Sequence, residues 1–322
     1  MGQINCSQMN KFFLKILCFT TIILCQEWAS QSGGFLRMGL TARSIAMGGG
    51  YTAELDQGFP NFHNPAWSAF LIKKHFGSSY SNLTLDRRLA STSIAFSIPP
   101  TAGIGLAWVY SGVSNIQGRY SSGMKSTKMQ TGENAIIITF AQRIVPWLSI
   151  GANFKILRYD LPITQSDQIS GTGLGFDIGL LVKTGGSTSL GIMIQDLSSN
   201  YQWDTNAIYA QGGPYKESFP TIFRIGSRFY KNDLLVVGDV GLITDINRNR
   251  RPTYLGILPR LGVEYSFLEQ YFFRGGYGNG RISFGFGYEY SLFKSKDSKI
   301  DYSFSLDWVS QSAHTISYAY SF

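Results

Sequence analysis

The chain has 322 residues, of which 44% are apolar and 15% are charged, so wholesale disorder is excluded and either two domains or one large β domain is allowed. Its 36 glycines, 18 tyrosines and 23 phenylalanines are unusual for a soluble enzyme and favour a membrane β-barrel with aromatic girdles and small residues inside. The formal net charge of +8 is compatible with anionic lipid head groups, with nucleic acid, or with solvated basic loops.

Residues 1–30 resemble a secretory signal peptide. Lys11 and Lys15 form a basic region, and the apolar run at 12–25 is too short for a spanning helix. All three cysteines fall inside this leader, so we expect a mature chain without thiol or disulfide chemistry. No later segment offers about 18 consecutive apolar residues, which excludes a helical span. We therefore expect an exported protein, for which lipid or lipopolysaccharide head groups are better partners than nucleic acid.

Residues 31–72, which we call the hatch, form a compact prefix. Thr41 is expected to cap a short helix that runs to Ala46 and is ended by the glycines at 48–50. Pro60 and Pro65 are expected to exclude regular structure from the segment that follows. About 40 residues cannot bury a core of their own, so this segment needs a host surface or cavity.

Residues 73–322 alternate between large apolar and small or polar side chains. In the segment 299–309, Ile300, Tyr302 and Phe304 share one face, while Asp301 and Ser303 take the other. A soluble sheet would carry many Lys, Glu and Thr residues on its polar face, whereas here that face is mostly Gly, Ser and single acids. This pattern predicts an all-β, antiparallel transmembrane barrel with its bulky side chains toward lipid.

The alternation predicts about fourteen strands. They are expected at 76–85, 90–98, 102–111, 133–144, 147–158, 172–183, 187–196, 220–230, 233–243, 257–268, 271–277, 280–292, 299–309 and 314–322. Short connections alternate with long ones at 112–132, 159–171, 197–219 and 244–256, as expected for periplasmic turns and outer loops. This places the N-terminus on the periplasmic side of an outer membrane.

The last strand ends the chain on an aromatic carboxylate. The final nine residues, HTISYAYSF, alternate aromatic and small residues and finish at Phe322. A terminal strand of this kind resembles the signal that the barrel-assembly machinery reads, so we expect that machinery as a partner.

The hatch also carries a family signature. The run FLRMGLTARSIAMGGGYTAELD at 35–56, followed by Asn64-Pro65-Ala66, resembles the N-terminal signature of PorV/PorQ outer-membrane proteins and, more loosely, the plug of FadL-type channels. The segments IQDL at 194–197 and FPTIFRIG at 219–226 support the resemblance. His63 and Trp67 depart from the pattern, which leaves ligand geometry open.

The resemblance implies that the hatch is tucked into a fourteen-stranded barrel, where buried Arg43 or Asp56 would need a partner from the lumen wall. The hatch candidates for gating are Arg43, Gly48, Asp56, His63, Asn64, Pro65, Ala66 and Trp67. The wall candidates for a polar network are Lys155, Asp177, Arg224, Arg228, Asp239, Glu264, Glu289, Asp301 and Asp307.

The sequence does not indicate catalysis, metal binding or nucleotide binding. The three histidines His63, His75 and His314 lie in different elements without metal-ligand spacing, and nothing marks a catalytic base. Alternate glycines at 276–280 are followed by no helix, so a nucleotide site is not expected. We expect no enzyme activity, no catalytic residue, no metal and no cofactor.

Three functions remain open. The first is an accessory component of type IX secretion that delivers proteins to the cell surface, with secreted proteins or secretion components as partners. The alternative is a FadL-like channel for hydrophobic small molecules such as long-chain fatty acids, with an outer site at Tyr201, Trp203, Ile208 and Tyr209. The third is an exported soluble β protein.

Overall fold

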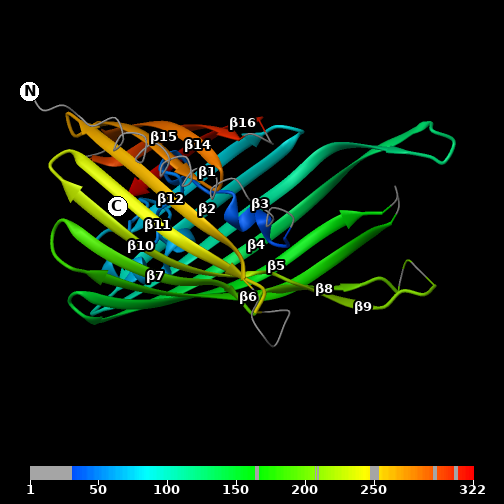
Figure 1. Cartoon of the computed structure of the whole chain (residues 1–322), viewed down its shortest axis with the longest axis horizontal. Helices are drawn as coiled ribbons and strands as arrows, with labels where there is room; N and C mark the ends of the chain where they lie inside the picture. The colour runs from blue at the N-terminus through cyan, green and yellow to red at the C-terminus, as the bar shows by residue number, and fades with distance from the viewer. Residues whose placement is uncertain are drawn as a thin grey trace, which may run out of the picture.

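A computed structural model describes residues 31–163, 167–206, 208, 210–246, 254–292, 296–307 and 311–322. Within this described part, fourteen antiparallel strands close into a barrel (Figure 1). The expected signal peptide, Tyr209 and the basic loop at 248–251 lie outside the described residues.

Each strand of the barrel pairs with its neighbours in the chain, except that β7 pairs with β10; the pairing of β1 with β16 completes the ring. The strands are β1 (His75–Leu83), β2 (Arg87–Ile98), β3 (Ala102–Arg119), β4 (Lys125–Val145), β5 (Leu148–Pro162), β6 (Gln168–Lys183), β7 (Thr188–Leu197), β10 (Thr221–Lys231), β11 (Leu234–Thr244), β12 (Tyr254–Phe267), β13 (Tyr271–Gly278), β14 (Arg281–Ser291), β15 (Lys296–Asp307) and β16 (Gln311–Ser321). Each of the fourteen overlaps one of the segments predicted from the alternation, so the fold class is confirmed.

The expectation of long loops at 112–132 and 159–171 is wrong, because strand pairing continues through most of both segments. The pairing of β3 with β4 continues to Arg119 and Lys125, and that of β5 with β6 continues to Pro162 and Gln168. Continuing the ladder satisfies backbone groups that a loop would leave to water. The segment 197–219 likewise contains a hairpin of β8 (Asn200–Asp204) and β9 (Pro214–Ser218), which joins the sheet through β6. These hairpins project beyond the barrel at one end, which we call the hairpin end (Figure 1).

The two ends of the barrel sequence meet at the opposite end, which we call the terminal end. There the backbone groups of Lys74 and Phe322 exchange two hydrogen bonds of 2.9 Å. An even number of strands returns the chain to the side from which it started, as the strand count predicts.

The outer surface of the barrel is apolar. Leu106, Ile138, Phe140 and Phe284 each leave about half of the side chain exposed, and they represent a much larger set. Apolar surface on this scale is unfavourable in water and fits the hydrocarbon of a bilayer. The alternation therefore separates a lipid-facing surface from the lumen.

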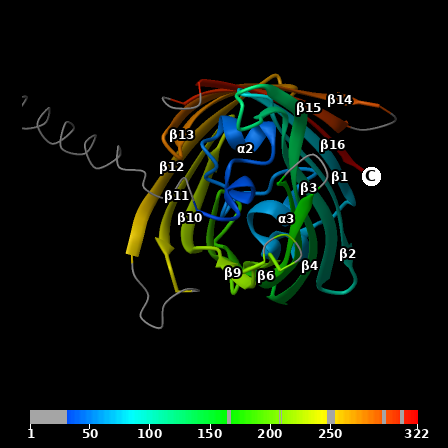
Figure 2. The same cartoon turned by 90° about the vertical axis from the view of Figure 1, so that its right-hand side faces the viewer.

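The hatch lies inside the lumen (Figure 2). It contains η1 (Gly34–Arg37), α2 (Ala42–Ala46), α3 (Pro60–His63) and η2 (Pro65–Phe70). None of the helices in the described residues is long and apolar enough to cross a membrane. The Thr41 hydroxyl accepts a hydrogen bond from Ser44 N and so caps α2, as the sequence predicts.

The expectation that Pro60 and Pro65 exclude regular structure is wrong. Each proline occupies the first turn of a short helix, where its missing N–H costs no hydrogen bond and its fixed φ suits the helix.

Glycines of the wall let the hatch backbone approach closely. A Cβ at Gly276 would lie 2.4 Å from Gly48 N, and one at Gly262 would lie 2.4 Å from Met47 O. Gly48 itself has φ +65°, a conformation that favours glycine, and it ends α2. The hatch is therefore held against β12 and β13 by direct backbone contact.

Candidate functional site

One buried ion network fastens α2 of the hatch to the wall. Arg43 donates two hydrogen bonds of 2.9 Å to the Glu264 carboxylate, from Nε and from Nη2. Arg274 donates to the same carboxylate and to Asp301 at 2.7 Å. All four side chains are buried, so their pairing offsets the cost of removing the charges from water.

The hatch contributes a carboxylate to this network as well. Glu54 lies 3.5 Å from Arg43 Nη2 and forms an ion pair with Arg228 of β10. Burial raises the pKa of Glu54, and the two guanidinium groups oppose that shift. The hatch is thereby bound to β10 as well as to β12.

A second network joins η1 to β5, β6 and β7. Lys155 Nζ lies 2.6 Å from both Asp177 Oδ1 and Asp196 Oδ1, and Arg37 lies 3.4 Å from Asp196 Oδ2. Asp196 is fully buried and has φ +60°, where a bulge shifts the β6–β7 register. Asn153 links the network to the hatch by donating to Asp177 Oδ2 and to Asn61 O, each at 3.0 Å.

Asp239 of the wall and Asp56 of the hatch bind groups of the hatch outside the two networks described above. Asp239 Oδ2 of the wall accepts hydrogen bonds from Thr52 N at 3.0 Å and from its hydroxyl at 2.6 Å. Asp56 takes its partners from the hatch, because Thr41 binds it and His63 Nε2 lies 3.2 Å away. The expectation that Asp56 needs a partner from the wall is therefore wrong.

The Asn64-Pro65-Ala66 motif docks onto β5 and β6. Asn64 Nδ2 donates to Thr52 O at 2.8 Å and to Leu180 O at 3.2 Å, while Asn64 Oδ1 accepts from Ala66 N. Ser149 donates to Ala66 O at 2.9 Å. Adding a Cβ to Gly179 would place it 2.9 Å from the Pro65 ring. The motif thus closes a turn and attaches it to the wall.

Several of the predicted residues lie outside these networks, among them Gly48 and Trp67 of the hatch. Arg224 is buried beside the hatch and forms no ion pair with another described residue, and Glu289 is half-buried near the terminal end. Phe322 is exposed and stacks on Tyr320. The side chain of Asp307 lies outside the described part of the structure.

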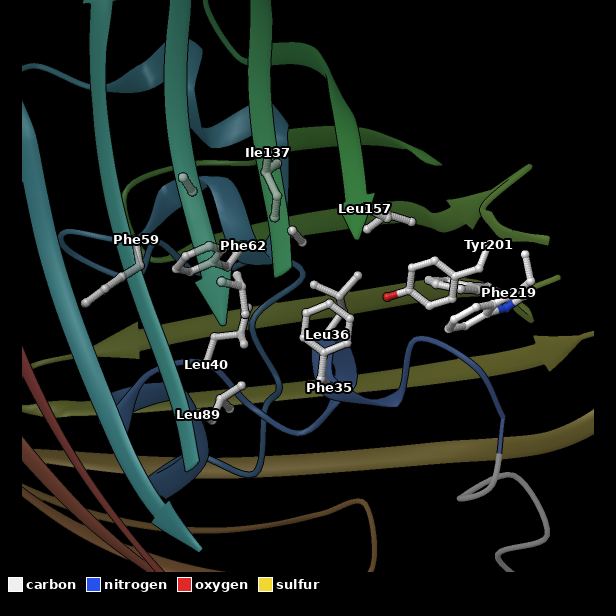
Figure 3. Close-up of a cluster of buried hydrophobic side chains, with 14 of the residues drawn as sticks. Phe35, Leu36, Leu40, Phe59, Phe62, Leu89, Ile137, Leu157, Tyr201 and Phe219 are labelled. Carbon is white, nitrogen blue, oxygen red and sulfur yellow. The ribbon is translucent and has the colours of Figure 1, made fainter. Parts of the chain in front are cut away.

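An apolar cluster fills the lumen between the hatch and the hairpin end (Figure 3). Phe35, Leu36 and Phe62 reach it from the hatch, and Ile137 and Leu157 reach it from the wall. Its buried members are Phe35, Leu36, Leu40, Phe59, Phe62, Leu89, Ala107, Val109, Ala135, Ile137, Leu157, Ile169, Tyr201, Trp203 and Phe219. A barrel lumen is ordinarily polar, so this apolar section is the most distinctive feature of the interior.

The β8–β9 hairpin covers the cluster. Tyr201 and Trp203 are 1% and 7% exposed, and the Tyr201 ring meets the Phe219 ring edge-on at 5.0 Å. Ile208 packs against the cluster from the loop between the two strands. Three of the four residues that the sequence proposed as an outer apolar site therefore lie together at the hairpin end, Tyr201 and Trp203 buried and Ile208 partly buried.

Two cavities adjoin the hatch. A pocket of about 390 Å³ opens near the terminal end, between Trp67 and Phe70 of the hatch and Lys183 and Lys299 of the wall. A cavity of about 30 Å³ lies between the hatch and the wall residues Gln195, Arg224 and Arg260.

Sequence reasoning missed Arg37, Glu54, Asp196, Arg260, Arg274 and Lys299 among the interior charges. A signal for two of them was present, because Arg274 lies two residues before Gly276 and Lys299 two residues before Asp301, on the lumen side of the alternation. Asp196 lies in the IQDL segment, but its role depends on a positive φ that the alternation does not reveal.

No protein-family model matches the sequence, and no curated protein sequence matches it. Solved structures are nevertheless similar in fold. The toluene transporter TodX of Pseudomonas putida aligns with a TM-score of 0.65 and 14% identity, over 88% of this chain and 99% of that one.

Two further structures are similar to this chain. The toluene transporter TbuX of Ralstonia pickettii gives a TM-score of 0.61 at 15% identity, covering 88% of this chain and 98% of that one. A FadL homologue of Pseudomonas aeruginosa gives 0.62 at 12% identity, with the same coverage. At these identities the likeness establishes the fold alone, which is a closed fourteen-stranded antiparallel barrel similar to that of FadL-like proteins.

Proposed function

We propose that this chain is an outer-membrane channel for hydrophobic small molecules and catalyses no reaction. The observation that supports this most is the apolar cluster in the lumen, because apolar side chains inside a barrel with an apolar exterior suit a hydrophobic cargo. The structures that share the fold include transporters of toluene and a homologue of FadL, which is consistent with such a cargo.

In this proposal a ligand enters at the hairpin end, which faces the cell exterior. Tyr201, Trp203 and Phe219 separate to admit it, and it then exchanges contacts with Phe35 and Phe62 of the hatch. The hairpins of β3–β4 and β8–β9 extend on this side, as outer loops do. The terminal end then faces the periplasm. The start of the hatch lies toward the hairpin end, because Ser32 donates a hydrogen bond to Glu217 of β9 and Gly33 lies against the Phe219 ring.

The hatch acts as the gate. Its ion pairs with Glu264 and Asp196 hold it across the lumen, so passage requires it to shift relative to the wall. The pocket of about 390 Å³ on the terminal side receives the ligand after that shift.

Uptake of labelled toluene and of a labelled long-chain fatty acid tests the proposal, in a Gram-negative host that lacks its own channels for them. The chain should raise uptake above the empty vector. Leu36→Lys should reduce uptake by roughly tenfold or more, since a buried unpaired ammonium in the apolar path is very costly. The matched control is Leu85→Lys, in the exposed turn between β1 and β2, which should leave uptake unchanged. Wild-type uptake equal to that of the vector would refute the proposal.

A second candidate is an accessory role in type IX secretion. The β3–β4 hairpin, which extends to Arg119 and Lys125, offers an exposed surface for a protein partner, and the signature around Arg43 and Asn64 supports it. Deleting the gene and measuring surface display of secreted proteins separates the two functions. Loss of display with normal uptake of small molecules would favour secretion, whereas normal display would eliminate that role.

A further inference from the structure

Two arginines of the lumen wall are buried side by side without a carboxylate to neutralise both. Arg224 of β10 and Arg260 of β12 are each 6% exposed, and both line the cavity of about 30 Å³ beside the hatch. Their strands flank β11, on which Asp239 lies opposite Arg260. Burial of a charge at this depth is costly unless the charge is paired.

The hydrogen bonds of these arginines do not provide that pairing. Arg260 donates to Asn279 Oδ1 at 3.0 and 3.3 Å and to Gly49 O at 3.1 Å, all of them neutral acceptors. The Nε of Arg224 has no hydrogen-bond partner, and no ion pair joins its guanidinium to another described residue.

The neighbouring acids do not balance both arginines. Asp239 Oδ2 accepts hydrogen bonds from Thr52 and its Oδ1 has no hydrogen-bond partner, while neither arginine forms an ion pair with this carboxylate. Asp196 is shared by Arg37 and Lys155, and Lys155 also binds Asp177. Two guanidinium groups facing one carboxylate therefore leave one positive charge unbalanced around this cavity.

The lining of the cavity suits an anion. No Asp or Glu side chain lines it among the described residues. Arg224 and Arg260 line it together with Asn279, Gln195, Ser44 and His63, and so does Arg37, whose charge is paired with Asp196. A volume of about 30 Å³ accommodates one or two particles of the size of water, which excludes an organic acid with an apolar body. Water would fit but carries no charge to offset that of the arginines.

We propose that this cavity binds one small monovalent anion of the halide class between Arg224 and Arg260. The anion completes the contact of the hatch with the wall, because Arg260 also holds Gly49 O and Asn279 also holds Arg37 O. The site does not depend on what the channel carries.

Crystals of the full chain, purified in detergent and soaked in sodium bromide, test this directly. An anomalous bromine peak is expected in the cavity of the wild-type protein and should be absent from Arg224→Gln. Ordered water alone in the wild-type cavity, or a bromine peak that persists in Arg224→Gln, would overturn the proposal.

Thermal unfolding gives an independent readout. At equal ionic strength, chloride should raise the melting temperature of the wild type by a few degrees over gluconate, because an anion that binds only the folded state stabilises it. Arg260→Gln should lose this difference, and Arg158→Gln, whose side chain is 60% exposed, should retain it. Equal melting temperatures of the wild type in the two salts would also count against the site.

Discussion

At the scale of single residues, the depth of an ion pair determines how much its loss costs. Glu264 binds Arg43 and Arg274 in the buried network, so Glu264→Gln leaves two guanidinium groups with too little negative charge. We expect a loss of about 3–5 kcal/mol in the free energy of unfolding, measured by reversible denaturation in lipid. The control is Asp160→Asn, whose partner Arg158 is largely exposed, and it should cost no more than about 1 kcal/mol. Similar losses in the two variants would show that the Glu264 network does not hold the hatch.

Neighbouring glycines of β13 should respond in opposite ways to the same change. A Cβ at Gly276 would meet Gly48 N at 2.4 Å, whereas the nearest atom to a Cβ at Gly275 is on Phe284 at 4.0 Å. Gly276→Ala should therefore displace the hatch and speed amide hydrogen exchange over residues 42–50, while Gly275→Ala exchanges like the wild type. Protection that is unchanged in Gly276→Ala would contradict the close packing of hatch and wall.

At the scale of elements, the β8–β9 hairpin closes the apolar cluster without being part of the barrel. Deleting residues 200–218 removes Tyr201 and Trp203 but leaves β7 paired with β10. We expect a folded barrel, judged by its heat-dependent mobility in gels, with reduced uptake of hydrophobic compounds. Deleting 118–127 at the tip of the β3–β4 hairpin is the matched control and should leave uptake unchanged. Equal uptake by both deletion variants would remove the hairpin from the proposed path.

The elements also show what the sequence can predict. All fourteen strands follow from a two-residue period, because only alternation can present one face to lipid and the other to the lumen. The same period places Asp177, Asp239 and Asp301 inside, where they are buried. The two-residue period does not predict which side chains interact across the lumen, since these contacts depend on where the hatch lies. The binding of Asp56 by Thr41 and His63, and the reach of Asn279 from a turn to Arg260, therefore emerge only from the structure.

For the molecule as a whole, the apolar exterior indicates whether water or lipid surrounds the barrel. A soluble exported β protein would meet water with Leu106, Phe140 and Phe284, whereas a membrane barrel meets hydrocarbon. In a membrane, the free-energy cost of a charged substitution on the outer face depends on its height along the barrel. In water it does not.

Ile138 and Ile144 of β4 provide a matched pair, since both are isoleucines on the outer face and are 46% and 59% exposed. Ile138 lies well inside the strand and Ile144 one residue from its end at Val145. Ile138→Arg should cost about 2–4 kcal/mol in folding into phospholipid vesicles, and Ile144→Arg about 0–1 kcal/mol, because the cost of a buried charge falls toward the interface. In water an arginine at either exposed position would cost little. Equal small costs at both positions would therefore favour the soluble protein, and a cost that depends on depth would place β4 across a bilayer.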